Sequence, residues 1–171
     1  MTSTASKTLS EIEVFRSNAR TTHKVVRLNV EGLTQQDSLI QPAPAGNCLN
    51  WVMGHLVYVY DQLLPLLGQK PVAEPDAVKR YARGTAPLTN PSGALQLDDL
   101  MRSWDEASKR IDAGLTSLTL HALDAHVSFS PSNNPEETLR SLLATVFFHQ
   151  AYHAGQTGIL RRIAGKDGAI R

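Results

Sequence analysis

The sequence has little of what would tie the protein to a membrane, to nucleic acid or to an oxidising compartment. Its single cysteine, Cys48, excludes an internal disulfide and is consistent with a reducing compartment. The formal net charge is only +1, so the basic surplus typical of nucleic-acid-binding domains is missing. No run approaches the roughly 18 apolar residues that a membrane-spanning helix needs. We therefore expect a cytoplasmic protein with neither a membrane nor a nucleic acid as its partner.

The composition that is present indicates one globular domain. The chain has 171 residues, of which 42% are hydrophobic and 19% charged, enough to bury one core. The stretch Met1–Leu9 is rich in Ser and Thr and lacks the apolar segment of a secretory signal. We expect residues 1–8 to be frayed and residues 1–171 to form a single domain.

Apolar residues recur at helical spacing in four segments, and none of the chain shows convincing strand alternation. The segments are approximately residues 10–33, 48–67, 97–118 and 135–164. Asn47 is expected to cap the second helix and Gly68 to end it. Asn134 is expected to cap the fourth, with Pro135 at its first position. The pattern predicts an all-α four-helix bundle, and the proline-containing connection 68–96 is long enough to suggest a function or local structure of its own.

The clearest chemical signal is a pair of histidines one helical turn apart. His149 and His153 lie on one face of the fourth helix because they are four residues apart. Apolar neighbours such as Leu142, Val146 and Leu160 indicate that this face points into the bundle. Buried imidazoles without partners are costly, and a metal ion would satisfy one nitrogen of each. Hydrogen bonds between the rings or to the backbone are the alternative.

His55 lies on the most apolar of the predicted helices. A lone histidine in such a helix is more often a hydrogen-bonded core residue. Together with an inward-facing pair on another helix, however, it favours a three-histidine metal site. Gly54 and Gly155 each remove a side chain beside a proposed ligand, so we expect them to let two helices approach closely.

Three neutral imidazoles limit the choice of metal. They suit a divalent transition metal ion, Zn or Ni first, with Fe, Co, Cu and Mn open, and they do not suit Mg or Ca. Three protein ligands leave a position open, as in catalytic zinc sites, where the ion lowers the pKa of a bound water or thiol. Binding requires neutral imidazoles, so affinity is expected to fall below about pH 6.

Other metal-site patterns are missing. The zinc-protease motif needs a Glu general base where Gln150 stands, and the Glu-x-x-His pattern of di-iron bundles is absent.

Gln156 and Tyr58 are candidates for contacts that support the ligands, and ordinary helix packing is the alternative role for both. His23 is a further candidate for a fourth ligand. No catalytic residue is assigned.

Two stretches resemble the DinB/YfiT-like superfamily of metal-binding four-helix bundles. One runs from Asn47 to the Gly54-His55 pair, and the other is the H-x3-H-x-G-Q pattern of residues 149–156, followed by two arginines and Gly165. The resemblance spans about residues 9–165. It implies an up-down bundle with a long crossover between helices 2 and 3, metal ligation by His55, His149 and His153, and a homodimer. Characterised branches include thiol S-transferases and a metal-dependent isomerase acting on a thiol adduct, but no substrate carries over.

Two classes of function follow from these observations. The first is a metal-dependent enzyme, such as an S-transferase that joins a low-molecular-weight thiol to a small-molecule substrate. A metal-dependent hydrolase is a variant, which the missing carboxylate base makes less attractive. The second class is a non-catalytic metal-binding, ligand-binding or stress-response protein.

Overall fold

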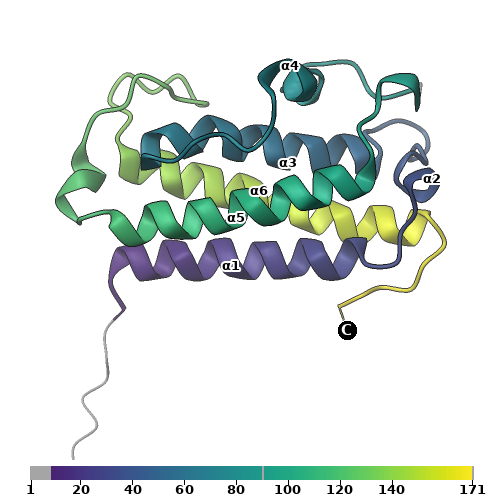
Figure 1. Ribbon diagram of the computed structural model, residues 1–171, viewed down its shortest axis with the longest axis horizontal. Helices are drawn as coiled ribbons and strands as arrows, with labels where there is room; N and C mark the ends of the chain where they lie inside the picture. The colour runs from purple at the N-terminus through teal and green to yellow at the C-terminus, as the bar shows by residue number, and fades with distance from the viewer. Residues whose placement is uncertain (1–8, 90, 171) are drawn as a thin grey trace, which may run out of the picture.

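The computed structural model describes residues 9–89 and 91–170, which contain four long helices lying side by side (Figure 1). They are α1 (Glu11–Val30), α3 (Leu49–Leu63), α5 (Leu97–Ser117) and α6 (Leu139–Ile163). Shorter elements are α2 (Gln35–Ser38), α4 (Pro75–Val78) and the 3₁₀ helices η1 (Leu64–Leu67), η2 (Lys79–Tyr81), η3 (Pro91–Gly93) and η4 (His121–Asp124). No strand forms among the described residues, so the all-α prediction is confirmed. The expected fraying of residues 1–8 lies outside them.

Each long helix packs against two others. α1 and α3 both contact α5 and α6. In Figure 1, α1 and α6 run from left to right, whereas α3 and α5 run from right to left. The consecutive long helices α3 and α5 are therefore parallel, and the strict up-down alternation that was expected is not kept. Residues 68–96 leave α3 at the left-hand end and reach the start of α5 at the right, carrying α4 over the outer side of α3. Among the described residues, no helix is both long and apolar enough to cross a bilayer.

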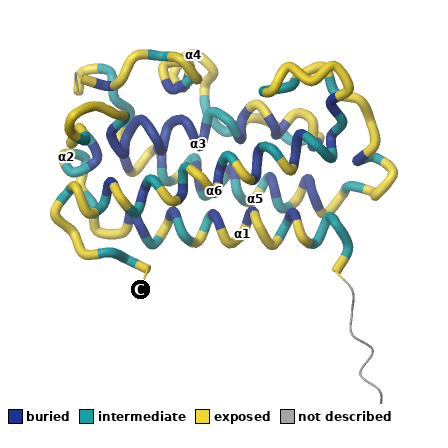
Figure 2. The backbone as a smooth tube through the Cα atoms, turned by 180° about the vertical axis from the view of Figure 1, so that it is seen from behind, coloured by how far each residue is buried: buried dark blue, intermediate teal, exposed yellow. Residues whose placement is uncertain are grey.

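The core lies between the four helices, and α3 is the most enclosed of them (Figure 2). Every residue from Leu49 to Val57 is buried. Tyr60 of α3 stacks on Trp104 of α5, with 4.9 Å between ring centroids. The side of α3 that faces away from the other long helices is therefore packed against α4 and η2 of the following connection.

Two predicted helix starts are wrong. α3 begins at Leu49 with Cys48, not Asn47, at the N-cap position. α6 begins four residues later than predicted, at Leu139, because Thr138 forms a capping box with Ser141. Pro135 and Glu136 form a turn, and the Glu137 carbonyl accepts from the Val127 N–H beside the antiparallel bridge of His126 and Thr138, so the helix starts only after Thr138.

The predicted stop at Gly68 is confirmed. Gly68 has a φ of 69°, a left-handed conformation that favours glycine. Pro65 lies within η1, so the last turn before the stop tightens into a 3₁₀ helix. This stop fixes where residues 68–96 begin to turn back over α3.

Candidate metal centre

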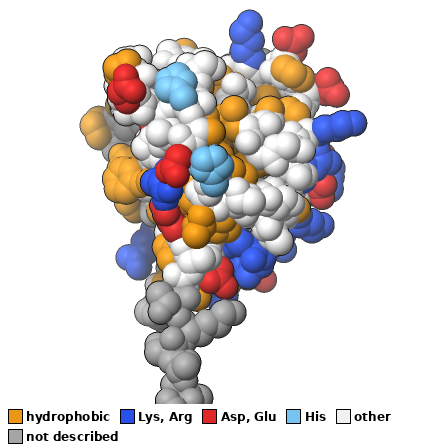
Figure 3. All heavy atoms as spheres, turned by 90° about the vertical axis from the view of Figure 1, so that its left-hand side faces the viewer, with side chains coloured by type: hydrophobic (Ala, Val, Ile, Leu, Met, Phe, Trp, Pro, Cys, Tyr) orange, Lys and Arg blue, Asp and Glu red, His pale blue; other side chains and the backbone are white. Residues whose placement is uncertain are grey.

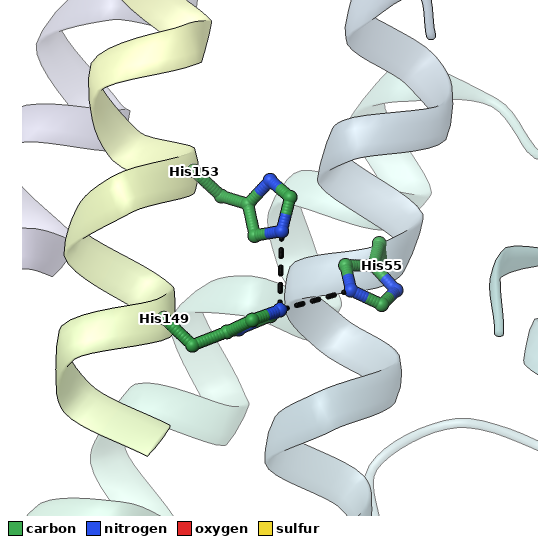
Figure 4. Close-up of side chains that lie close together, drawn as sticks. All are labelled: His55, His149 and His153. Atoms are coloured by element: carbon green, nitrogen blue, oxygen red, sulfur yellow. Dashed lines mark hydrogen bonds between the residues drawn. The ribbon is translucent and has the colours of Figure 1, made fainter. Parts of the chain in front are cut away.

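The structure brings His55, His149 and His153 together between α3 and α6 (Figure 4). The Nε2 atom of His149 lies 3.1 Å from Nε2 of His55 and 3.1 Å from Nε2 of His153. One ring nitrogen from each residue falls within 4.8 Å of the others. Nitrogen ligands of a single Zn²⁺ ion, each about 2.0–2.1 Å from it, lie about 3–3.4 Å apart. The two distances from His149 match this spacing, and the nitrogens of His55 and His153 are close enough to approach the same ion.

Contacts on the far side of two rings fix their tautomers. Nδ1 of His55 donates to the main-chain carbonyl of Tyr81 at 2.6 Å. Nδ1 of His153 donates to the side-chain carbonyl oxygen of Gln156, also at 2.6 Å. Because a carbonyl oxygen only accepts, both Nδ1 atoms carry the proton and both Nε2 atoms present a lone pair.

This tautomer pattern cannot be satisfied by hydrogen bonds among the three rings. The single proton that a neutral His149 can place on Nε2 satisfies only one of its two neighbours. The lone pair of the other neighbour then lies 3.1 Å from Nε2 of His149 with no proton directed at it, which is a repulsive contact. A cation shared by all three Nε2 atoms removes that repulsion, so the donor set fits a divalent metal ion.

The electrostatics keep the three rings neutral at pH 7. Burial lowers the pKa of His149 to about 4, and repulsion from His153 and His55 adds to the effect. Burial also lowers the pKa of His55 and of His153, and the hydrogen bonds that these rings donate to Tyr81 and Gln156 oppose the shift. Neutral imidazole is the form that binds metal, so no proton has to leave before an ion enters.

Aromatic rings hold His55 from the side. Trp51, one turn earlier on α3, stacks on it with 4.8 Å between centroids. The ring of Tyr58 lies nearly parallel to it at 6.4 Å. Tyr58 thus contacts His55 through its ring. Gln156, three residues after His153 on the same helix, accepts a hydrogen bond directly from that ligand. His149 has no such support: its Nδ1 is buried and has no partner among the described residues.

Tyr81 is a residue of the site that sequence reasoning missed. Its hydroxyl donates to Asn50 and accepts from the Leu95 N–H, so both ends of the residue are anchored. Gly54 makes room for it, because a Cβ there would lie 2.3 Å from the Tyr81 ring. The expected role of Gly54 is therefore corrected: it admits Tyr81, not another long helix. Gly155 faces open space, since a Cβ added there would meet nothing within 4 Å, so that expectation is wrong.

His23 is not part of this cluster. Its Nε2 lies 2.8 Å from a carboxylate oxygen of Asp105, in a contact between α1 and α5. The idea of a fourth ligand from α1 is therefore wrong. His121 and His126 lie on the exposed surface of the connection before α6.

A cavity of about 300 Å³ opens beside His55 and His149. α3 and α6 form its inner walls, and residues 82–83 and 129–131 form its outer rim. Its lining is mostly apolar and contains no Asp or Glu; the residues are His55, Tyr58, Val59, Gln62, Leu63, Ala82, Arg83, Phe129, Pro131, Leu142, Thr145, Val146 and His149. The histidine cluster thus borders a space that can hold a small molecule.

Comparison with known proteins supplies a family and a fold. The family model described as the DinB superfamily matches residues 18–157. A crystal structure of a conserved protein from Enterococcus faecalis superposes with a TM-score of 0.71 over 93% of this chain and 100% of that one. The two are 17% identical, so this likeness shows the fold alone. No curated protein matches the sequence.

Proposed function

This chain belongs to the DinB superfamily, and we propose that it is a metal-dependent enzyme whose ion is held by His55, His149 and His153. One observation carries the proposal. Tyr81 and Gln156 hold Nδ1 protons on two rings, so that Nε2 lone pairs converge where hydrogen bonds cannot satisfy them. Zn and Ni are the favoured ions, and Fe, Co and Mn follow.

The residues around the cluster favour an open, catalytic site over a closed structural one. Among the described residues three protein ligands are grouped, and a cavity borders two of them. When bound, the ion would supply Lewis acidity that favours the ionised form of a thiol or water. Trp51 and Tyr81 would keep His55 in place, Gln156 would orient His153, and the apolar walls would limit access of water.

Within this class we favour transfer of a low-molecular-weight thiol to a small electrophile. In that reaction the thiol sulfur bonds to an electrophilic carbon, the leaving group departs with its electron pair, and the thiol proton passes to solvent. The cavity lining supports this choice because the described residues that form it include no carboxylate. A hydrolase needs a general base to activate water. A thiol is more acidic than water, so its ionisation depends less on such a base. One buried cysteine, Cys48, suits a reducing cytoplasm.

We also propose that the four long helices form the four-helix bundle of this superfamily, with residues 68–96 as the crossover between the parallel helices α3 and α5, and that the protein is a homodimer. Support for a dimer comes from α6, which exposes Phe148, Tyr152, Ile159 and Ile163. Their spacing places them on one side of the helix, away from the buried stripe.

The experiment that tests the function begins with elemental analysis of the purified protein beside a variant that lacks all three histidines. The protein is then loaded separately with Zn, Ni, Mn and Fe and assayed with a panel of thiols and electrophiles. We expect turnover that requires both the metal and His153. Metal bound without any metal-dependent turnover, together with a large loss of thermal stability on chelation, would instead support a structural ion.

A further inference from the structure

The cavity beside the histidines contains one cationic side chain in an otherwise apolar and neutral lining. That residue is Arg83, on the outer rim. No ion pair to Arg83 forms among the described residues, whereas Arg16 and Arg20 share Asp112, and Arg27 pairs with Asp105. Among the described residues, the guanidinium of Arg83 makes one long hydrogen bond, from Nη1 to the Pro131 carbonyl at 3.4 Å. Its charge is therefore available to a ligand.

The backbone at Arg83 is fixed relative to the histidines. Tyr81, two residues earlier, accepts the hydrogen bond from His55. Two residues later, the Thr85 hydroxyl donates to the Ala82 carbonyl and accepts from the Trp51 indole N–H. Arg83 thus lies between two residues that are hydrogen-bonded to α3. A group bound to Arg83 would lie at a set distance from the metal centre.

The rest of the cavity matches an apolar body. Val59 and Leu63 come from α3, Leu142 and Val146 from α6, and Phe129 from the rim. Phe129 is half exposed, and Figure 3 shows hydrophobic side chains gathered on this end face of the molecule. At about 300 Å³ the space is at the small end of ligand pockets.

We propose that this cavity binds a small, mainly apolar molecule that carries one carboxylate, with the carboxylate on Arg83 and the apolar part between α3 and α6. One guanidinium fork matches one carboxylate in bidentate geometry. The described residues of the lining include no second Lys or Arg for a phosphate dianion. That the bound molecule reacts at the histidine cluster rests on the proposed function. Its binding requires only the cavity and Arg83.

The test uses isothermal titration of the full chain with three matched probes: 4-phenylbutyrate, 4-phenylbutanol and butyrate. Titrations are done on chelator-treated protein and on metal-loaded protein. We expect 4-phenylbutyrate to bind about fivefold or more tightly than the alcohol in both states, as for one partly exposed ion pair. Butyrate, which lacks the apolar body, is expected to bind too weakly to measure.

Three variants separate the contributions. Arg83→Gln should remove the preference for the acid and leave the affinity for the alcohol unchanged. Lys79→Gln, a matched change at an exposed cation outside the cavity, should keep the preference. Val59→Phe should weaken both phenyl compounds by filling the space, with thermal melting to confirm that each variant folds.

Several outcomes would overturn the inference. They are no binding of any probe, equal affinity for acid and alcohol, or a preference for the acid that survives Arg83→Gln. A preference that appears only with metal and ignores Arg83 would mean that the ion binds the carboxylate. Failure of the proposed function is a separate result, because it shows as missing metal or missing turnover and not in these chelator-treated titrations.

Discussion

At the scale of single residues, the orientation of each imidazole depends on what its second nitrogen meets. His55 meets a main-chain carbonyl and His153 meets a side-chain amide, whereas the buried Nδ1 of His149 meets no partner among the described residues. Groups behind metal ligands commonly change affinity by 10- to 100-fold, since they set both tautomer and ring angle. The three ligands are therefore unequally supported.

Gln156 provides the most direct test of that support. Gln156→Ala removes the acceptor that holds the Nδ1 proton of His153, and we expect metal affinity to fall by roughly 10- to 100-fold. Competition with a chromophoric chelator measures the change. Gln36→Ala, at an exposed glutamine of α2, is the matched control and should bind as the parent does. Unchanged affinity in Gln156→Ala would show that this contact only packs.

The lowered histidine pKa values also predict how the metal-free protein responds to acid. In the folded state the pKa of His149 is about 4, against about 6.5 when unfolded. Between these values the unfolded chain binds more protons, so the free energy of unfolding decreases as pH falls from about 6.5 towards 4. Above that range the stability is fully present.

Urea unfolding at a series of pH values, with chelator present, checks this dependence. The decrease should be smaller in His149→Phe, which has no proton to gain there. It should persist in His126→Gln, because His126 is exposed. Stability that rose on acidification through the same range would contradict the assigned environment of His149.

At the scale of helices and loops, the sequence was most informative where a contact lies within one helix. The convergence of His149 and His153 follows from a four-residue spacing, and a buried His55 follows from its apolar neighbours. The start of α6 could not be predicted in the same way. Asn134 and Pro135 form a plausible cap, but Pro135 lies in a turn, and the Glu137 carbonyl accepts from the distant Val127 N–H before the helix begins after Thr138.

The role of Tyr81 could not be predicted from the sequence for a related reason. Its contact with His55 joins residues 26 positions apart and uses a main-chain oxygen, which every residue has. The one local sign is Gly54 beside His55, which by itself predicts the close approach of two helices. Its neighbour proved to be an aromatic ring from the 68–96 connection.

Gly54 and Gly155 therefore form a matched pair for mutation, both inside helices but with opposite surroundings. Gly54→Ala places a methyl 2.3 Å from the Tyr81 ring. We expect a loss of about 1–3 kcal/mol in unfolding free energy, together with weaker metal binding as Tyr81 moves. Gly155→Ala meets open space and should gain about 0.5–1 kcal/mol from helix propensity.

Denaturant unfolding of the two variants, at one fixed protein concentration and with chelator present, measures the stability changes. A chelator competition then measures metal affinity in each. If Gly54→Ala retained parental stability and affinity, Tyr81 would not be the residue that positions His55.

At the scale of the whole molecule, α6 contributes to two surfaces. Its inner side supplies two histidines and the wall of the cavity, and its outer side carries large apolar residues in place of the charges expected on an exposed helix. Phe148 is 74% exposed and Ile159 is 62% exposed. Because His149 and His153 lie on the same helix, a partner on the outer side would stiffen the element that holds them.

The outer side of α6 predicts self-association that a single charge can abolish. In sedimentation velocity at micromolar concentration, we expect the parent protein to sediment as a dimer. Ile159→Glu places a carboxylate at the centre of the apolar stripe, and burying an unpaired charge is costly, so this variant should sediment as a monomer with its helical content retained. Val14→Glu makes the same change at an exposed position of α1 and should remain dimeric.

A parent that is monomeric at every concentration, or two variants that behave alike, would show that α6 is not the dimer surface. A monomeric Ile159→Glu protein that still binds metal with parental affinity would further show that the histidine site is complete within one chain.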